Sequence, residues 1–143
     1  MQQEKIWDNL AAQWNNFRVK PEPVVYYFFN KYCKNPGKIV DLGCGNCRNL
    51  IPFKNFELYG NDFSNKMLEK AELLAKKYNL KINLKKDYLT KLPFKNNFFD
   101  CALMLASLHH LETNEERIKA LKELYRILKN DGIVLITVWN KRQ

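Results

Sequence analysis

The segment Asp41–Cys47, written DLGCGNC, places an acidic residue, two glycines and two cysteines within seven positions. Glycine lets the backbone approach a ligand closely and adopt φ values that other residues avoid. A dinucleotide loop of the form G-x-G-x-x-G would need a third glycine where this chain has Arg48. A large side chain there would obstruct the close packing of helix on strand that this loop requires. The segment therefore predicts a ligand-binding loop and argues against NAD or FAD.

The cysteines leave a second interpretation of this segment open. Cys44 and Cys47 have the C-x-x-C spacing of a redox pair, which can also lie where a strand meets a helix. A four-ligand zinc site would need another ligand pair, and the adjacent His109 and His110 make a poor one. We therefore expect no metal site, and the redox pair remains the alternative.

Acidic residues follow two further predicted strands. Asp62 could accept hydrogen bonds from both hydroxyls of a ribose, and Asp87 could accept one from an adenine amino group, with Tyr88 or Leu89 against the ring. Taken singly, Asp62 could instead cap a helix and Asp87 could be a solvated turn residue. Three such positions at successive strand ends are less easily explained by chance, so they predict a nucleoside site.

A fourth loop, Ala106–His110, leaves the most apolar predicted strand. A histidine there could hydrogen-bond or orient a second reactant, and its charge can change near neutral pH. The alternative is a histidine that only fills the entry to the next helix. We treat His109 and His110 as candidates for a functional role.

Strands that alternate with helices must position these loops. Apolar spacing predicts an N-terminal helix with Ile6, Leu10 and Trp14 on one face, a helix from Pro23 ended by Asn35–Gly37, a short helix from near Asn46, and a helix capped by Ser64. A capping box at Thr113–Glu116 predicts a helix that turns Ile118, Leu121, Leu124, Tyr125 and Leu128 inward, before a turn at Asn130–Gly132. The predicted strands are 38–42, 57–61, 81–86, 99–106 and 133–139.

This alternation predicts an α/β class with a parallel, Rossmann-like sheet in one domain over 1–143, with helices in 1–35 and the core sheet in 38–143. Ligands of such sheets bind beyond the carboxyl ends of the strands, where the strand order switches. We therefore expect the four loops to converge.

Composition bounds the cellular context. The chain has 24 Lys and Arg against 15 Asp and Glu, a formal charge of +9, which attracts polyanions such as nucleic acid. The plainer interpretation is that lysines solubilise the surface. No apolar run reaches the roughly 20 residues of a membrane span, and the first residues lack the pattern of a signal peptide. We expect a cytoplasmic protein without a membrane partner.

Taken together, these motifs resemble the class I S-adenosylmethionine (SAM)-dependent methyltransferases. Their loop, D/E-x-G-x-G-x-G, is matched except at its last glycine, which is Cys47 here. A finer resemblance is to the tRNA wobble-uridine methyltransferases, which methylate the carboxylate of 5-carboxymethyluridine. The residues that carry it are Arg18, the KPEP segment 20–23, His109–His110 and the terminal segment 138–143. The chain departs from that family at Glu22, where tryptophan is usual, and at Arg142, where glutamate is usual.

The resemblance implies a site and partners. SAM would be held by Asp41, Gly43, Cys44, Gly45, Asp62, Phe63, Asp87, Tyr88 and Leu105, and Arg18 with His109 or His110 would hold the acceptor carboxylate. The implied partners are tRNA and a small zinc-binding activator protein. The family sheet normally has a further pair of strands after the fifth, so we expect this chain either to be a fragment or to be completed by a second chain. The alternatives are a methyltransferase for a small metabolite or lipid precursor, and a non-catalytic subunit with the same fold.

Overall fold

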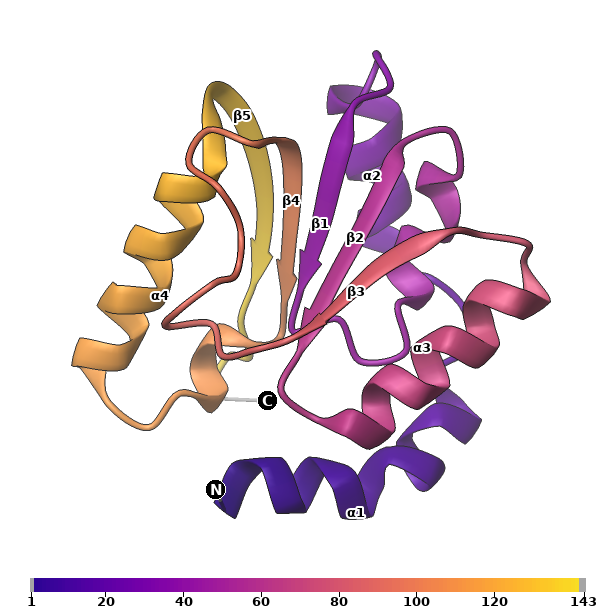
Figure 1. Ribbon diagram of the computed structural model, residues 1–143, viewed down its shortest axis with the longest axis vertical. Helices are drawn as coiled ribbons and strands as arrows, with labels where there is room; N and C mark the ends of the chain where they lie inside the picture. The colour runs from indigo at the N-terminus through magenta and orange to yellow at the C-terminus, as the bar shows by residue number, and fades with distance from the viewer. Residues whose placement is uncertain (1, 142–143) are drawn as a thin grey trace.

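Five parallel strands form the centre of the molecule in the order β3-β2-β1-β4-β5 (Figure 1). The computed structural model describes residues 2–141. The strands are β1 (Lys38–Leu42), β2 (Glu57–Asp62), β3 (Ile82–Lys86), β4 (Phe99–Leu105) and β5 (Leu128–Thr137). The predicted parallel α/β sheet is therefore confirmed. Because all five strands run the same way, their carboxyl ends lie together at one edge of the sheet.

Helices cover both faces of the sheet, because the central strands are nearly continuous apolar runs whose side chains must be buried on both sides. They are α1 (Gln2–Phe17), α2 (Pro23–Tyr32), the short 3-10 helix η1 (Arg48–Phe53), α3 (Asn65–Lys77), the 3-10 turn η2 (Leu108–His110) and α4 (Asn114–Ile127). One apolar core lies between the sheet and the side that carries α2, η1 and α3. A second core lies under α4, where Phe94 and Phe99 pack edge to face.

Helix α1 crosses below the carboxyl ends of the strands (Figure 1). Polar contacts hold it there: Ser64 Oγ donates to Asp8, and Lys86 Nζ pairs with Glu4 Oε1 at 2.6 Å. The expected face of α1 is wrong in part. Ala11 is the buried residue, and Ile6 and Leu10 are exposed. The reason is that α1 packs on α3 and beside the cavity at the carboxyl ends of the strands, and not on the main core.

Two other elements differ from expectation. The helix expected from Asn46 is a 3-10 helix that begins only at Arg48, because the glycine loop continues through Cys47 in a left-handed conformation. The turn expected at Asn130–Gly132 lies inside β5, where the register between β4 and β5 shifts.

The apolar face expected for α4 is also wrong in part. The helix starts at the predicted capping box and buries Ala120, Leu124 and Ile127. Ile118 and Tyr125 are instead 53% and 84% exposed, and Leu121 is also exposed. The buried face is therefore rotated relative to the predicted one, and α4 presents apolar side chains outward.

The sheet has two edges among the described residues, β3 and β5. The solvated face predicted for the third strand is confirmed, since its residues alternate between half-buried and exposed.

Within residues 2–141, no helix is both long enough and apolar enough to cross a membrane.

Candidate functional site

A cavity of about 380 Å³ opens at the carboxyl ends of the strands, where the loops after β1, β2, β3 and β4 converge. Every cofactor position expected from the sequence lies in its lining, as do Arg18 and His110. His109 is the expected site residue that the lining does not include. These roles were predicted from the sequence, and the structure adds their spatial convergence.

The loop after β1 depends on left-handed backbone. Gly43 and Gly45 have φ of 68° and 54°, and Cys47 has φ of 64°. Cys47 stands where the resembled family has its third glycine. It adopts the left-handed conformation typical of glycine, and its small side chain is buried. A Cβ at Gly45 would lie 2.8 Å from Trp14 Cη2, and one at Gly43 would collide with Ser107 Oγ. The glycines therefore let α1 and the β4 loop close onto this segment.

Asp62 ties the first two loops together. Its Oδ2 accepts from Gly45 N and its Oδ1 from Ser64 N, each at 2.9 Å. Burial raises the pKa of Asp62, and the bonds from Ser64 and Gly45 oppose that rise. Each carboxylate oxygen has two lone pairs, so acceptor capacity remains for a ligand.

Asp41 is the most desolvated acid of the site. It is 2% exposed, and its Oδ2 has no hydrogen-bond partner within residues 2–141. Burial, reinforced by the charge of Asp62, raises the pKa of Asp41 to about 8, while Arg48 opposes the rise. An orphaned buried carboxyl beside a cavity suits a ligand that brings a cation or several donors.

The loop after β3 is held by Asn61, a residue that sequence reasoning missed. Asn61 Oδ1 accepts from Gly43 N at 3.3 Å, and Asn61 Nδ2 donates to the Asp87 carbonyl at 3.1 Å. Asp87 Oδ1 accepts from Tyr88 N at 2.9 Å, and Tyr88 meets Phe63 edge to face. These contacts place two aromatic rings and a carboxylate in the cavity wall, an arrangement that fits a nucleoside.

The two histidines occupy different positions. His110 lines the cavity and meets Trp7 edge to face at 5.2 Å. His109 Nδ1 accepts from Trp139 N at 3.4 Å, and its ring lies 4.6 Å from the Trp139 ring. Burial lowers the pKa of both, so both favour the neutral form. Of the two, His110 can meet a ligand and His109 supports Trp139. The last two positions of the terminal segment, Arg142 and Gln143, lie outside the described residues.

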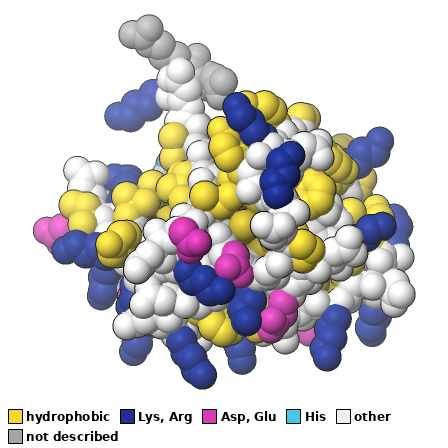
Figure 2. All heavy atoms as spheres, turned by 90° about the horizontal axis from the view of Figure 1, so that it is seen from above, with side chains coloured by type: hydrophobic (Ala, Val, Ile, Leu, Met, Phe, Trp, Pro, Cys, Tyr) yellow, Lys and Arg dark blue, Asp and Glu magenta, His cyan; other side chains and the backbone are white. Residues whose placement is uncertain are grey.

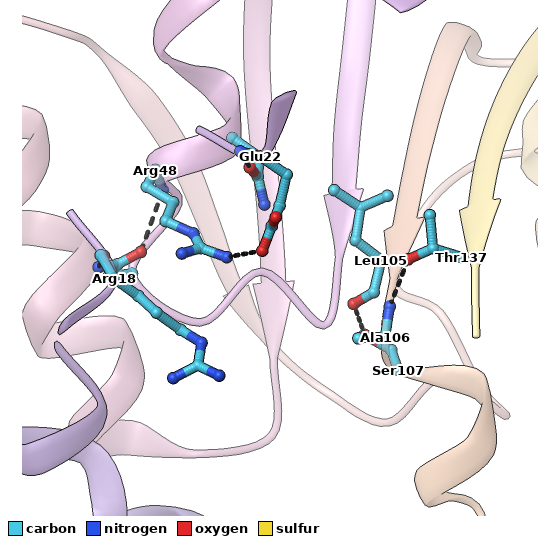
Figure 3. A network of polar contacts seen from close by, with 9 residues as sticks. Arg18, Glu22, Arg48, Leu105, Ala106, Ser107 and Thr137 are labelled. Carbon is cyan, nitrogen blue, oxygen red and sulfur yellow. Dashed lines mark hydrogen bonds and ion pairs between the residues drawn. The ribbon is translucent and has the colours of Figure 1, made fainter. Parts of the chain in front are cut away.

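The turn after β4 is strained where it enters the cavity. Ala106 has φ of 50°, and its N–H donates to both the carbonyl and Oγ1 of Thr137 at 3.0 Å (Figure 3). Strained backbone that the surrounding structure holds in place is a feature of functional sites. The turn aims Ser107 at the glycine loop, where its Oγ lies 3.4 Å from Leu42 O; the same Oγ lies 3.0 Å from Leu105 O at the end of β4.

Two arginines lie at the other end of the cavity. Arg18 follows α1, and Arg48 opens η1 and is paired with Glu22 (Figure 3). Sequence reasoning weighed Arg48 only as an obstacle to a dinucleotide loop and missed it as a site residue. The signal available was its place directly after the glycine loop.

The cysteine alternatives do not fit this geometry. Cys44 and Cys47 are buried free thiols, and burial raises the pKa of Cys44 well above its ordinary value. A redox pair needs an accessible thiolate, which such a site disfavours. Across residues 2–141, no group of three or more His, Cys, Asp or Glu could hold a metal ion.

The parallel sheet, the left-handed glycine loop and the acidic residues at successive strand ends define a Rossmann-like domain that holds a nucleoside cofactor. The chain belongs to the family described as a methyltransferase domain, whose model matches residues 40–136. Its cofactor is SAM. The orphaned Asp41 carboxyl, the glycine cradle and the Asp62 carboxylate are compatible with the ammonium and ribose hydroxyls of that molecule.

Known proteins resemble the chain in sequence and in fold. The chain is 33% identical over 140 residues to the Saccharomyces cerevisiae tRNA (carboxymethyluridine(34)-5-O)-methyltransferase, covering 97% of this chain and 48% of the yeast protein. The crystal structure of the PH0226 protein of Pyrococcus horikoshii is 30% identical, with a TM-score of 0.72 over 79% of this chain and 55% of that one. A Haloferax volcanii methyltransferase in complex with the Trm112 methyltransferase activator shares the fold, with a TM-score of 0.78 and 20% identity over 94% of this chain and 59% of that one. The chain spans about half the length of the yeast relative.

Proposed function

We propose that this chain is the catalytic domain of a SAM-dependent methyltransferase that acts on the carboxylate of 5-carboxymethyluridine at the tRNA wobble position. The observation that carries the proposal is the similarity to the yeast enzyme, which covers 97% of this chain. Arg18 and His110 lie in the same cavity as the glycine loop, which supports a role beside the cofactor.

Methyl transfer to a carboxylate requires the protein mainly to hold the two reactants in the correct position. SAM, when bound, supplies a methyl group on a sulfonium, and an ionised carboxylate is already a nucleophile at neutral pH. No general base is needed, so the proposed roles include no catalytic triad. We propose that Asp41, Asp62, Asp87 and Tyr88 hold the cofactor and that Arg18 and His110 hold the acceptor about 3 Å from the methyl carbon.

We propose tRNA as the substrate-bearing partner. The net charge of +9 supports RNA binding. On the face seen in Figure 2, Lys and Arg side chains project around the rim and acidic side chains are few. The positive charge is spread over several elements, so it supports general attraction of RNA and does not mark one docking helix.

We further propose a small zinc-binding activator as a protein partner, supported by the activator complex of the Haloferax relative. A second segment or chain that pairs with β5 would cover the second edge of the described sheet, since β5 carries the apolar run IVLIT. An unpaired apolar edge strand invites association. The cytoplasmic location remains a prediction.

The test is methyl transfer from labelled SAM to tRNA that carries 5-carboxymethyluridine, with and without the activator, followed by nucleoside analysis. Formation of the methyl ester at the wobble uridine is the expected result. Transfer to small acids with no dependence on tRNA would favour the metabolite alternative. Failure to bind SAM, alone or with the activator, would favour the non-catalytic alternative.

A further inference from the structure

Arg48 has a degree of burial that is unusual for a charged residue. It is 8% exposed, and its Nη2 lies 2.6 Å from Glu22 Oε1. Its Nε is buried and has no hydrogen-bond partner among the described residues. The Glu22 side chain is 47% exposed, so much of the partner charge is screened by water. A buried guanidinium with one half-solvated partner is incompletely satisfied.

Trp14 links Arg48 to Arg18. The guanidinium carbons of Arg18 and Arg48 lie 5.3 and 5.4 Å from the centroid of the Trp14 ring. The ring is pressed onto Gly45, and all three side chains line the cavity. Figure 3 shows both guanidiniums on the same side of the site, with Glu22 reaching Arg48.

The charges at this end of the cavity are unbalanced. Two guanidiniums face the carboxylate of Glu22, and the nearby Asp41 adds little negative charge at neutral pH because burial raises its pKa to about 8. Burial lowers the pKa of Arg48; Glu22 opposes that effect, and the positive charge of Arg18 adds to it. An anion placed between the two arginines would relieve their repulsion and complete the hydrogen bonding of Arg48.

We propose that Arg18 and Arg48, whose guanidiniums both lie against the Trp14 ring, form a two-arginine clamp for a ligand carboxylate, and that Glu22 is the internal carboxylate that holds Arg48 until the ligand arrives. Arg48 is then a specificity-determining residue, because its planar fork matches a carboxylate. The carboxylate has two possible sources, the methionine part of the cofactor or the carboxymethyl group of the acceptor. Binding of the acceptor carboxylate rests on the proposed function, whereas binding of the methionine carboxylate requires only that the chain binds SAM.

Two ligands separate the sources. S-adenosylhomocysteine carries the methionine carboxylate, and 5′-methylthioadenosine shares the nucleoside and lacks it. Binding of both would be measured by calorimetry for the native chain, for Arg48→Gln and Arg48→Lys, and for Lys54→Gln as a control that removes an exposed charge next to η1. Tm values would confirm that each variant folds.

If the clamp takes the cofactor carboxylate, Arg48→Gln weakens S-adenosylhomocysteine about tenfold or more and leaves 5′-methylthioadenosine unchanged, since hydrogen bonds to charged groups are of that strength. If it takes the acceptor carboxylate, both affinities stay unchanged and the KM for carboxymethyluridine tRNA rises about tenfold with a smaller change in kcat. Arg48→Lys restores part of either loss. Lys54→Gln changes neither affinity.

Glu22→Gln tests the internal carboxylate. It keeps the side-chain shape and removes the competing charge, so the affinity or KM of the carboxylate ligand should improve severalfold. A structural ion pair predicts the reverse, a weaker site.

Other outcomes would overturn the clamp. These are an equal loss of both ligands in Arg48→Gln, or no change in either affinity together with an unchanged KM. If the native chain methylates no tRNA under any condition, the proposed function fails, and the two-ligand comparison alone decides: an unchanged S-adenosylhomocysteine affinity then refutes the clamp.

Discussion

Replacing Asp41 by Asn should stabilise the ligand-free protein at alkaline pH. The carboxyl is 2% exposed, its Oδ2 has no hydrogen-bond partner in the part of the chain that the structure describes, and the neighbouring Asp62 carboxylate disfavours a second negative charge. Above its pKa, the folded protein must hold a buried charge that the unfolded chain exposes to water. Asn has nearly the same shape and carries no charge, so the substitution removes that electrostatic cost.

The magnitude follows from the pKa shift. Burial raises the pKa of Asp41 from 3.8 to about 8. At about 1.4 kcal/mol per pH unit, the destabilisation is on the order of 5 kcal/mol once both states are ionised. The folded state binds the extra proton, so the stabilising contribution is complete below pH 3.8 and is lost as the pH rises to about 8. The buried Asn amide would lack a partner, which costs about 1–3 kcal/mol.

The assay is urea unfolding of the native chain and Asp41→Asn between pH 5 and 9. The unfolding free energy of Asp41→Asn minus that of the native chain should rise with pH up to about 8 and then level off. S-adenosylhomocysteine, whose ammonium can pair with the carboxylate, should bind the native chain more tightly as the pH rises from 6 to 8, and bind Asp41→Asn without that dependence. A native chain that is more stable than Asp41→Asn at pH 8.5 would refute the reasoning, because it would show a carboxylate already compensated in the free protein.

Three further predictions concern the cofactor, the loop and the RNA. Asp62→Asn should weaken S-adenosylhomocysteine about tenfold in calorimetry, since charged acceptors strengthen hydrogen bonds, and an unchanged affinity would remove Asp62 from the site. Cys47→Gly should be more stable than Cys47→Ala by about 1 kcal/mol in chemical unfolding, because only glycine is relaxed at φ of 64°; the opposite order would show that this backbone is not strained. Binding of tRNA should weaken steeply with salt, by nearly one log unit per log unit of salt for each phosphate neutralised, and a flat profile in filter binding would point to a small acceptor.

Much of the fold could be predicted from local pattern. The strands begin and end within about two residues of expectation for β1 to β4, because β1, β2 and β4 are short, largely apolar runs and β3 alternates between half-buried and exposed residues. The Ser64 and Thr113 caps are both present, since a cap depends on side chains within a few positions. The same local logic placed Asp41, Asp62 and Asp87 at strand ends, and a parallel sheet must bring strand ends together.

The sequence alone therefore determined the fold class, the strand-end loops and the kind of ligand they hold. Only the tertiary structure decided which face of α1 meets the cavity, which histidine reaches it, and that Arg48 lies over Trp14 beside Arg18. The reason is distance along the chain: Glu22 and Arg48 are 26 positions apart, and Trp139 is 30 from His109. Periodicity and capping report on neighbours within one or two turns, and contacts between distant segments depend on how whole elements pack.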